Sequence, residues 1–181
     1  MKYLILFLSL LCFNSSVNGQ SANQKKLFAD KKKSEIIYNM DHPLHSWSGV
    51  SKDVNSVILI DSNSGIISQV AVSVKIASFD SQNANRDSHA IEVTEALKFP
   101  MIKFNSSQIK QEGNKLTVSG TINFHGVNQP ITFNAIKKNS GKNIEVSGGF
   151  EIKMTQFKLD PPTLMGISTD DEININFNVF F

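Results

Sequence analysis

Histidine is the residue type in this sequence best suited to hold a metal ion, and it occurs at His42, His45, His89 and His125. A zinc site needs three or four ligands that converge to about 2.0–2.3 Å from the ion. His42 and His45 are three positions apart, which on one strand places them on opposite faces. No cysteine and no His-Glu helix motif stands near them. We therefore predict no metal site and no cofactor, with the histidines forming hydrogen bonds at strand ends and in loops.

The segment Arg86-Asp87-Ser88-His89 contains the side-chain types of a serine hydrolase triad. Such a triad needs a strained, exposed nucleophile and an oxyanion hole, and no nucleophile elbow is present. The simpler interpretation makes Asp87 the N-cap of a helix over residues 88–98, with Arg86 able to pair with a nearby carboxylate. We predict no catalytic residue here, and we expect that the protein is not an enzyme.

Alternation of apolar and polar residues dominates the rest of the chain. Three segments alternate almost without slips, over residues 116–124, 144–154 and 173–181. Period 2 is the signature of a strand with one apolar and one wet face. Shorter alternating runs start near Ser34, His45, Val54, Val70, Ile102 and Ile131. About eight strands joined by turns predict an antiparallel meander that closes as a sandwich or a barrel.

The N-terminal residues form a separate unit. A short basic start, an apolar run over residues 4–13 and a small, polar stretch up to Gly19 have the order of a secretory signal peptide, and the run is too short to span a bilayer. We predict a signal peptide at 1–19, a polar, lysine-rich lead-in at 20–33 that is partly helical or disordered, and one domain at 34–181. The protein is then secreted or periplasmic, with no later membrane-spanning segment and without Cys12, its one cysteine.

Charge and composition narrow the choice of partners. The formal net charge is only +2, and the lysines gathered between residues 25 and 33 precede the first predicted strand. No aromatic residues interleave with a basic stripe elsewhere, so nucleic acid is not expected as a partner.

An ordered set of short motifs resembles a known family. The motifs are Phe79-Asp80-Ser81, Asn85-Arg86-Asp87-Ser88-His89, Phe99-Pro100-Met101-Ile102-Lys103-Phe104-Asn105-Ser106, Val118-Ser119-Gly120-Thr121-Ile122-Asn123-Phe124-His125-Gly126-Val127 and Pro130-Ile131. Their order and spacing are similar to those of the YceI-like family of exported lipid- and polyisoprenoid-binding proteins, over roughly residues 36–181. The family commonly has two histidine-bearing strands at its N-terminal end, where this chain has one compressed stretch, His42–Gly49.

The resemblance implies an all-β fold, an antiparallel eight-stranded lipocalin-like barrel with one short helix. It also implies that an isoprenoid lipid, such as a quinone or a polyprenol, lies in the lumen for transport, storage or sequestration. An eight-stranded barrel can hold one small ligand. The expected ligand-binding residues are Trp47, Val72, Val74, Ile76, Phe104, Val118, Ile122, Phe124, Phe133, Val146, Phe150, Ile152, Ile175 and Phe177.

Two other function classes stay open. One is a small exported enzyme that acts on an apolar compound. The other is an eight-stranded outer-membrane barrel, because alternation does not say which face points inward and the chain ends in the aromatic residue Phe181. Outer-membrane barrels carry aromatic girdles at both interfaces, whereas this chain has one Trp and two Tyr.

Overall fold

The computed structural model describes residues 23–140, 143–164 and 166–181, so the predicted signal peptide lies outside the described residues. One antiparallel sheet of ten strands, in the order β1-β4-β5-β6-β7-β8-β9-β12-β2-β3, accounts for most of this chain. Its strands are β1 (Gln24–Phe28), β2 (Glu35–His42), β3 (His45–Ser51), β4 (Asn55–Asp61), β5 (Ile67–Lys75), β6 (Met101–Glu112), β7 (Lys115–Phe124), β8 (Val127–Ser140), β9 (Asn143–Lys153) and β12 (Glu172–Phe180).

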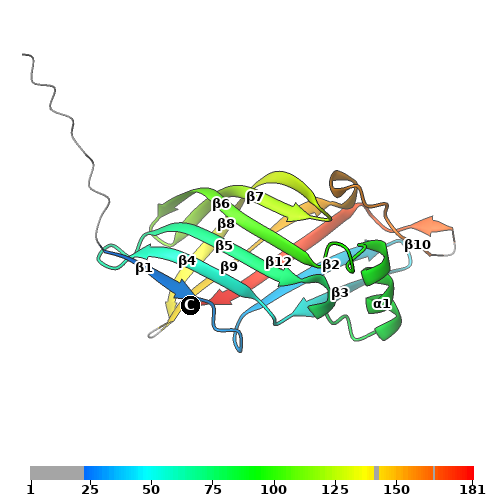
Figure 1. Ribbon diagram of the computed structural model, residues 1–181, viewed down its shortest axis with the longest axis horizontal. Helices are drawn as coiled ribbons and strands as arrows, with labels where there is room; N and C mark the ends of the chain where they lie inside the picture. The colour runs from blue at the N-terminus through cyan, green and yellow to red at the C-terminus, as the bar shows by residue number, and fades with distance from the viewer. Residues whose placement is uncertain (1–22, 141–142, 165) are drawn as a thin grey trace, which may run out of the picture.

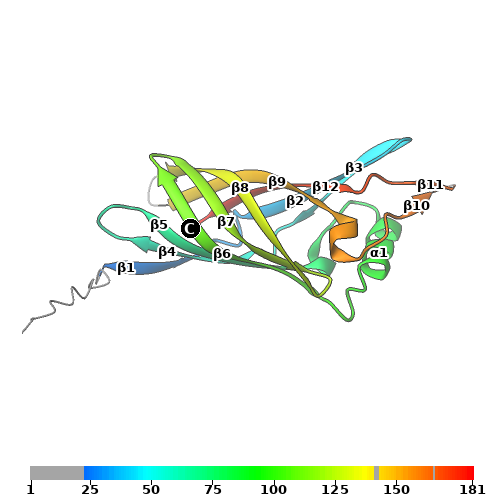
Figure 2. The same ribbon diagram turned by 90° about the horizontal axis from the view of Figure 1, so that it is seen from above.

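The sheet curls around its long axis, and the remaining elements gather at one end of it (Figures 1 and 2). These elements are the helix α1 (Ala84–Val93), the 3₁₀ turns η1 (Ile76–Ser78) and η2 (Met154–Phe157), and the small hairpin of β10 (Thr163–Leu164) and β11 (Ile167–Ser168). No helix in the described ranges is long and apolar enough to cross a membrane. The architecture confirms an antiparallel barrel with one short helix, built from ten strands in its main sheet rather than eight.

The lead-in contributes one of the additional strands. Residues 24–28 form β1, which pairs with β4 from Gln24 opposite Asp61 to Phe28 opposite Val57. The expectation of a helical or disordered segment is therefore wrong at these positions. An edge strand offers a row of unpaired backbone groups, and β1 satisfies them on β4 although its own side chains are mostly exposed.

Individual backbone hydrogen bonds, outside the strand pairings, connect segments near the two edges of the curled sheet. Val50 and Asp80 exchange two backbone hydrogen bonds of 3.0 Å, which link β3 to the segment that follows β5. The Ala29 amide continues the β1–β4 pairing by donating to the Ser56 carbonyl at 2.9 Å, and the next amide, of Asp30, donates to the Phe180 carbonyl of β12 at 2.7 Å. The lumen is thus enclosed by ladder bonds on most sides and by individual bonds at this seam.

The compressed stretch near the N-terminus forms a complete hairpin. β2 and β3 are joined by Pro43 and Leu44 alone, and His42 lies directly opposite His45. The prediction that these histidines occupy opposite faces of one strand is wrong, because the chain reverses between them. Their ring centroids are 5.5 Å apart.

Helix α1 starts and ends earlier than predicted. Asn83 is its N-cap, and its side-chain oxygen accepts hydrogen bonds from the amides of Asn85 at 3.1 Å and Arg86 at 3.2 Å. Asp87 lies within the first turn, so its assignment as the N-cap is wrong. The helix ends at Val93, and Glu95 takes a left-handed backbone conformation, with φ of 46°, that cannot continue it.

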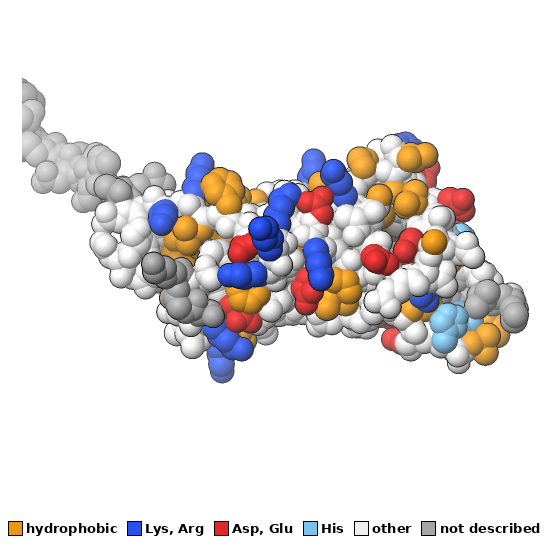
Figure 3. Space-filling view, turned by 90° about the horizontal axis from the view of Figure 1, so that it is seen from below, with side chains coloured by type: hydrophobic (Ala, Val, Ile, Leu, Met, Phe, Trp, Pro, Cys, Tyr) orange, Lys and Arg blue, Asp and Glu red, His pale blue; other side chains and the backbone are white. Residues whose placement is uncertain are grey.

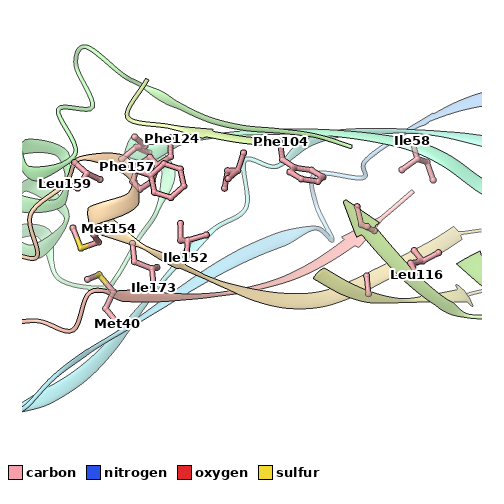
Figure 4. Packing of buried hydrophobic residues seen from close by; sticks show 14 of the residues in the cluster. Met40, Ile58, Phe104, Leu116, Phe124, Ile152, Met154, Phe157, Leu159 and Ile173 are labelled. Carbon is pink, nitrogen blue, oxygen red and sulfur yellow. The ribbon is translucent and has the colours of Figure 1, made fainter. Parts of the chain in front are cut away.

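In the alternating strands, the apolar side chains point to the inside of the curled sheet and the polar side chains point to the outside. On β7, Leu116, Val118, Gly120, Ile122 and Phe124 are buried, while the residues between them are exposed or half-buried. Figure 4 shows core residues from opposite walls, such as Phe104 and Ile152, pointing into the enclosed space. Charged side chains are spread over the outer face in Figure 3. This is the reverse of the lipid-facing arrangement that the outer-membrane alternative requires.

Candidate ligand-binding site

Two adjoining cavities occupy the inside of the barrel. The first, of about 160 Å³, lies beside α1 and is called the helix-end chamber. The second, of about 130 Å³, extends toward the opposite end, where Ile67, Leu116 and Phe181 line it, and is called the inner chamber. Phe79, Ile102, Ile152 and Ile175 line both. The two chambers therefore follow one another along the lumen.

Phenylalanine rings form much of the wall of the inner chamber. Phe133 is central, with ring centroids 5.0 Å from Phe150, 5.4 Å from Phe104 and 5.7 Å from Phe177. Ser56 and Lys103 are the only polar residues among those that line this chamber, and the Ser56 hydroxyl donates to the Ala71 carbonyl. Such a surface stabilises apolar groups by removing them from water.

Two glycines make room for these rings. A Cβ atom at Gly120 would lie 2.6 Å from Cζ of Phe104, and one at Gly148 would lie 2.8 Å from Cζ of Phe177. Both distances are too short for a real side chain. The glycines thus let the rings lie close against the neighbouring strands.

The helix-end chamber carries a polar group that the inner chamber lacks. We call Tyr38, Trp47, Ser81, Arg86 and Asp87 the mouth cluster; all except Ser81 line the chamber. Asp87 Oδ1 accepts hydrogen bonds from the amide of Ser81 at 3.1 Å and from its hydroxyl at 2.6 Å. Arg86 donates from Nε to the Ser81 hydroxyl at 2.9 Å and from Nη2 to the Ser81 carbonyl at 3.2 Å.

Aromatic side chains complete the mouth cluster. The guanidinium carbon of Arg86 lies 5.5 Å from the centroid of the Trp47 ring, within the range of a cation–π contact. Burial raises the pKa of the Tyr38 hydroxyl, and the negative charge of Asp87 raises it further. Tyr38 therefore stays neutral and can donate a hydrogen bond.

A second polar contact lies just outside this chamber. His125 Nδ1 lies 2.9 Å from the Phe157 carbonyl, and Nε2 lies 2.6 Å from a carboxylate oxygen of Glu95. Both contacts are within hydrogen-bond distance, so the ring bridges the Phe157 carbonyl and the Glu95 carboxylate. The hydrogen bond from His125 holds the pKa of Glu95 below its usual value, with help from the charge of Lys98. The contact ties the segment after α1 to the β7–β8 turn and η2.

Comparison with known proteins identifies this architecture. The family model described as a YceI-like domain matches residues 28–181. The chain belongs to the YceI-like family. A UPF0312 protein of Photorhabdus laumondii is 32% identical over 136 residues, which cover 69% of this chain and 71% of that protein. Protein YceI of Salmonella newport is 27% identical over 138 residues, which cover 75% of this chain and 72% of the Salmonella protein.

Solved structures share the YceI-like fold. Burkholderia cenocepacia BcnA superposes with a TM-score of 0.75 at 21% identity, over 84% of this chain and 99% of that chain. A polyisoprenoid binding domain from Saccharophagus degradans, described as implicated in plant cell wall breakdown, gives 0.66 at 13% identity, over 87% of this chain and 97% of that chain. At these identities the likeness concerns the fold.

In this YceI-like barrel, every predicted lumen residue lies on a chamber wall. Trp47, Ile76 and Phe124 line the helix-end chamber, Ile152 and Ile175 line both, and the others line the inner chamber. Their part in ligand binding stays a prediction. The sequence interpretation missed the residues that α1 contributes, such as Ile91.

In the part of the chain that the structure describes, residues 86–89 and the histidines make contacts other than those of a catalytic triad or a metal site. Asp87 is bound by Ser81, and His89 Nδ1 lies 3.6 Å from Glu92 on the surface, so residues 86–89 form no triad. His42 is buried, accepts from the Leu44 amide and donates to the Ile167 carbonyl. Within the described ranges, no three His, Cys, Asp or Glu side chains gather where they could share an ion. That the protein needs no metal stays a prediction.

Proposed function

We propose that this YceI-like protein binds an isoprenoid lipid, such as a quinone or a polyprenol, in its two chambers and carries, stores or sequesters it. The observation that carries this proposal is the pair of adjoining, apolar-lined cavities inside one barrel. Moving apolar surface from water into such a space contributes about 25 cal/mol per Å². A long, narrow hydrocarbon chain fits two chambers in series better than a compact molecule does.

The size of the chambers supports a flexible chain as the ligand. An engineered apolar cavity of roughly 150 Å³ takes up one benzene molecule, and each chamber has about that volume. A chain of several isoprene units must therefore occupy both and move rings such as Phe133. The Saccharophagus degradans neighbour is itself described as a polyisoprenoid binding domain, which supports this ligand class.

A carrier role fits the chemistry of the site better than catalysis. The acids and bases near the lumen already make structural contacts, with Asp87 bound to Ser81 and Glu95 to His125. Catalysis would need such groups positioned around a substrate. We also propose that residues 1–19 direct export and that the protein acts in the periplasm or outside the cell.

Filling the lumen tests the proposal. In Ile122→Trp the larger side chain occupies the inner chamber, where Ile122 is buried and lines the wall. The adjacent Thr121→Trp adds the same ring to the exposed side of the same strand. We expect farnesol binding, measured by calorimetry, to weaken at least tenfold in Ile122→Trp and to stay within twofold of the unmodified protein in Thr121→Trp.

A check that the variant is folded and a search for the native lipid complete this test. Overpacking costs about 1–3 kcal/mol, so circular dichroism must first show that Ile122→Trp is folded. Folded Ile122→Trp with undiminished binding would show that the lumen is not the site. Mass spectrometry of lipids extracted from protein purified from its native envelope would then identify the physiological ligand, and the absence of any isoprenoid there would contradict the proposed ligand class.

A further inference from the structure

The lysine-rich segment before β2 takes no part in the lumen. Residues 23–33 carry five lysines and one aspartate, whereas the whole chain has a formal net charge of only +2, so the rest of the chain is acidic by two charges. These residues form β1 and the turn after it. We define the β1 surface as the exposed side chains of Lys25, Lys26, Phe28, Lys31 and Lys32. We propose that the β1 surface binds the anionic surface of a lipid bilayer, an activity that goes beyond the lumen ligand and does not depend on it.

Phe28 is the apolar centre of the β1 surface, and the fold does not require it. Its side chain is 72% exposed, the highest exposure of any aromatic residue that the structure describes. The neighbouring Leu27 packs against the hydrophobic core, so alternation along β1 points Phe28 outward. β1 pairs with β4 through backbone groups, which a polar residue at this position would provide equally well. An outward aromatic side chain here is therefore better explained by a partner than by packing.

The outer face of the sheet beside Phe28 is apolar and hollowed. Phe28 lies opposite Val57, and Val57 lies opposite Ala71, so the three form a row across β1, β4 and β5. Two hollows, of about 360 Å³ and 370 Å³, have this row as a common wall. Lys26 lines the first hollow and Lys31 lines the second. Phe28 is therefore part of a continuous apolar strip that has a lysine on each side.

Most of the lysines around this strip keep their charge available. Lys31 pairs with Asp53 at 2.9 Å, but the ion pairs found within 4.0 Å among the described residues do not include Lys25, Lys26 or Lys32. Figure 3 shows Lys and Arg side chains gathered around apolar patches on the left half of the visible face. Each lysine near an anionic bilayer should strengthen binding about fivefold. The surface is therefore complementary in charge to anionic lipid head groups.

A bilayer fits the β1 surface better than a folded protein does. The described part of the segment, residues 23–33, has no arginine, tryptophan or tyrosine, the residue types that dominate protein interfaces. Lysine is a point charge on a flexible stem, and lysine combined with phenylalanine is typical of surfaces that lie in the membrane interface. Fluid lipid can also fill the two hollows without a matching shape. β1 and α1 lie at opposite ends of the barrel (Figures 1 and 2), so a bilayer bound at β1 leaves the helix end uncovered.

Vesicle binding tests this assignment. We would measure how the protein partitions onto sedimented vesicles of phosphatidylcholine, alone or mixed with phosphatidylglycerol. Binding to the mixed vesicles should be at least tenfold stronger and should disappear in about 1 M salt, which screens charges beyond about 3 Å. The double variant Lys26→Gln, Lys32→Gln should weaken it at least tenfold, and Phe28→Ala at least fivefold. The matched controls Lys158→Gln and Leu97→Ala change exposed side chains at the helix end and should stay within twofold.

The outcomes separate this inference from the proposed function. Every variant carries the same N-terminal residues, so differences between variants report on the β1 surface alone. Equal binding to both kinds of vesicle, binding to neither, or unchanged binding by the lysine and Phe28 variants would overturn the bilayer assignment. Binding of polyglutamate that needs Lys26, without vesicle binding, would assign the surface to acidic peptides and also overturn it. Farnesol affinity should stay within twofold in every variant, so each of these failures leaves the lumen proposal standing.

Discussion

The inner chamber and the helix-end chamber share four wall residues, yet they are built in different ways. The inner chamber is formed by the alternating side chains of the strands, and its stability comes from aromatic packing around Phe133. The helix-end chamber takes part of its wall from α1 and from the segment before it, and directional hydrogen bonds through Ser81 hold its polar residues. One half of the lumen is walled by strand side chains alone, and the other adds a hydrogen-bonded polar group.

The largest effect should follow a change in the aromatic wall. Phe104 is 8% exposed and lines the inner chamber. We expect Phe104→Ala to lower the free energy of unfolding by about 3–5 kcal/mol, because it removes buried surface and leaves a cavity. Denaturant unfolding measures this loss. The exposed Phe28→Ala should change it by less than about 0.5 kcal/mol, and equal losses in both variants would contradict the proposed role of the inner wall.

A smaller and different effect should follow a change in the mouth cluster. Ser81→Ala removes the hydroxyl that joins Arg86 to Asp87, which should cost about 1–3 kcal/mol of stability. Denaturant unfolding measures this loss. The exposed Ser88→Ala in α1 is the matched control. Equal free energies of unfolding for Ser81→Ala and Ser88→Ala would contradict the structural role of the Ser81 hydroxyl.

The smallest effect concerns the contact behind the helix. The pKa of Glu95 is lowered from its ordinary 4.5, chiefly by the hydrogen bond from His125. A lowered carboxyl pKa means that the stabilisation is present above that ordinary value and is lost as pH falls through the folded-state value. Glu95→Gln should therefore have a lower Tm than the unmodified protein at neutral pH, and the difference should become smaller at an acidic pH below the ordinary pKa of 4.5. An equal difference in Tm at both pH values would contradict this prediction. Glu112→Gln serves as the control, because Glu112 makes none of the ion pairs found among the described residues.

The sequence predicted best the features that depend on local pattern. Alternation in residues 116–124 and 173–181 was enough to predict strands, and the family resemblance supplied the barrel and the side chains that would point into it. Features fixed by distant contacts were missed. β1 is a strand because β4 presents a free edge, and no pattern among the lysines of residues 25–33 reveals that partner.

The start of α1 and the partners of Arg86 also depend on contacts that local sequence pattern does not reveal. Asp87 and Asn83 are both good N-caps by type, and the contact that distinguishes them is the hydrogen bond that Asp87 accepts from Ser81, a residue outside the helix. The sequence interpretation likewise offered Arg86 a carboxylate partner, whereas the structure gives it Ser81 and Trp47. Pairing of this kind depends on how the loop folds back, so sequence spacing could not supply it.

The backbone on either side of α1 has a consequence for how the lumen exchanges its contents. Gln82 and Glu95 flank the helix with φ values of 59° and 46°, a conformation that costs side-chain-bearing residues energy. None of the residues in α1 is fully buried, whereas β7 is bonded to a strand on each side. Local unfolding of the helix is therefore cheaper than parting the strands. The amide protons of α1 should exchange with solvent as a group well before those of β7, and the helix would then act as a foldon that opens while the barrel stays intact.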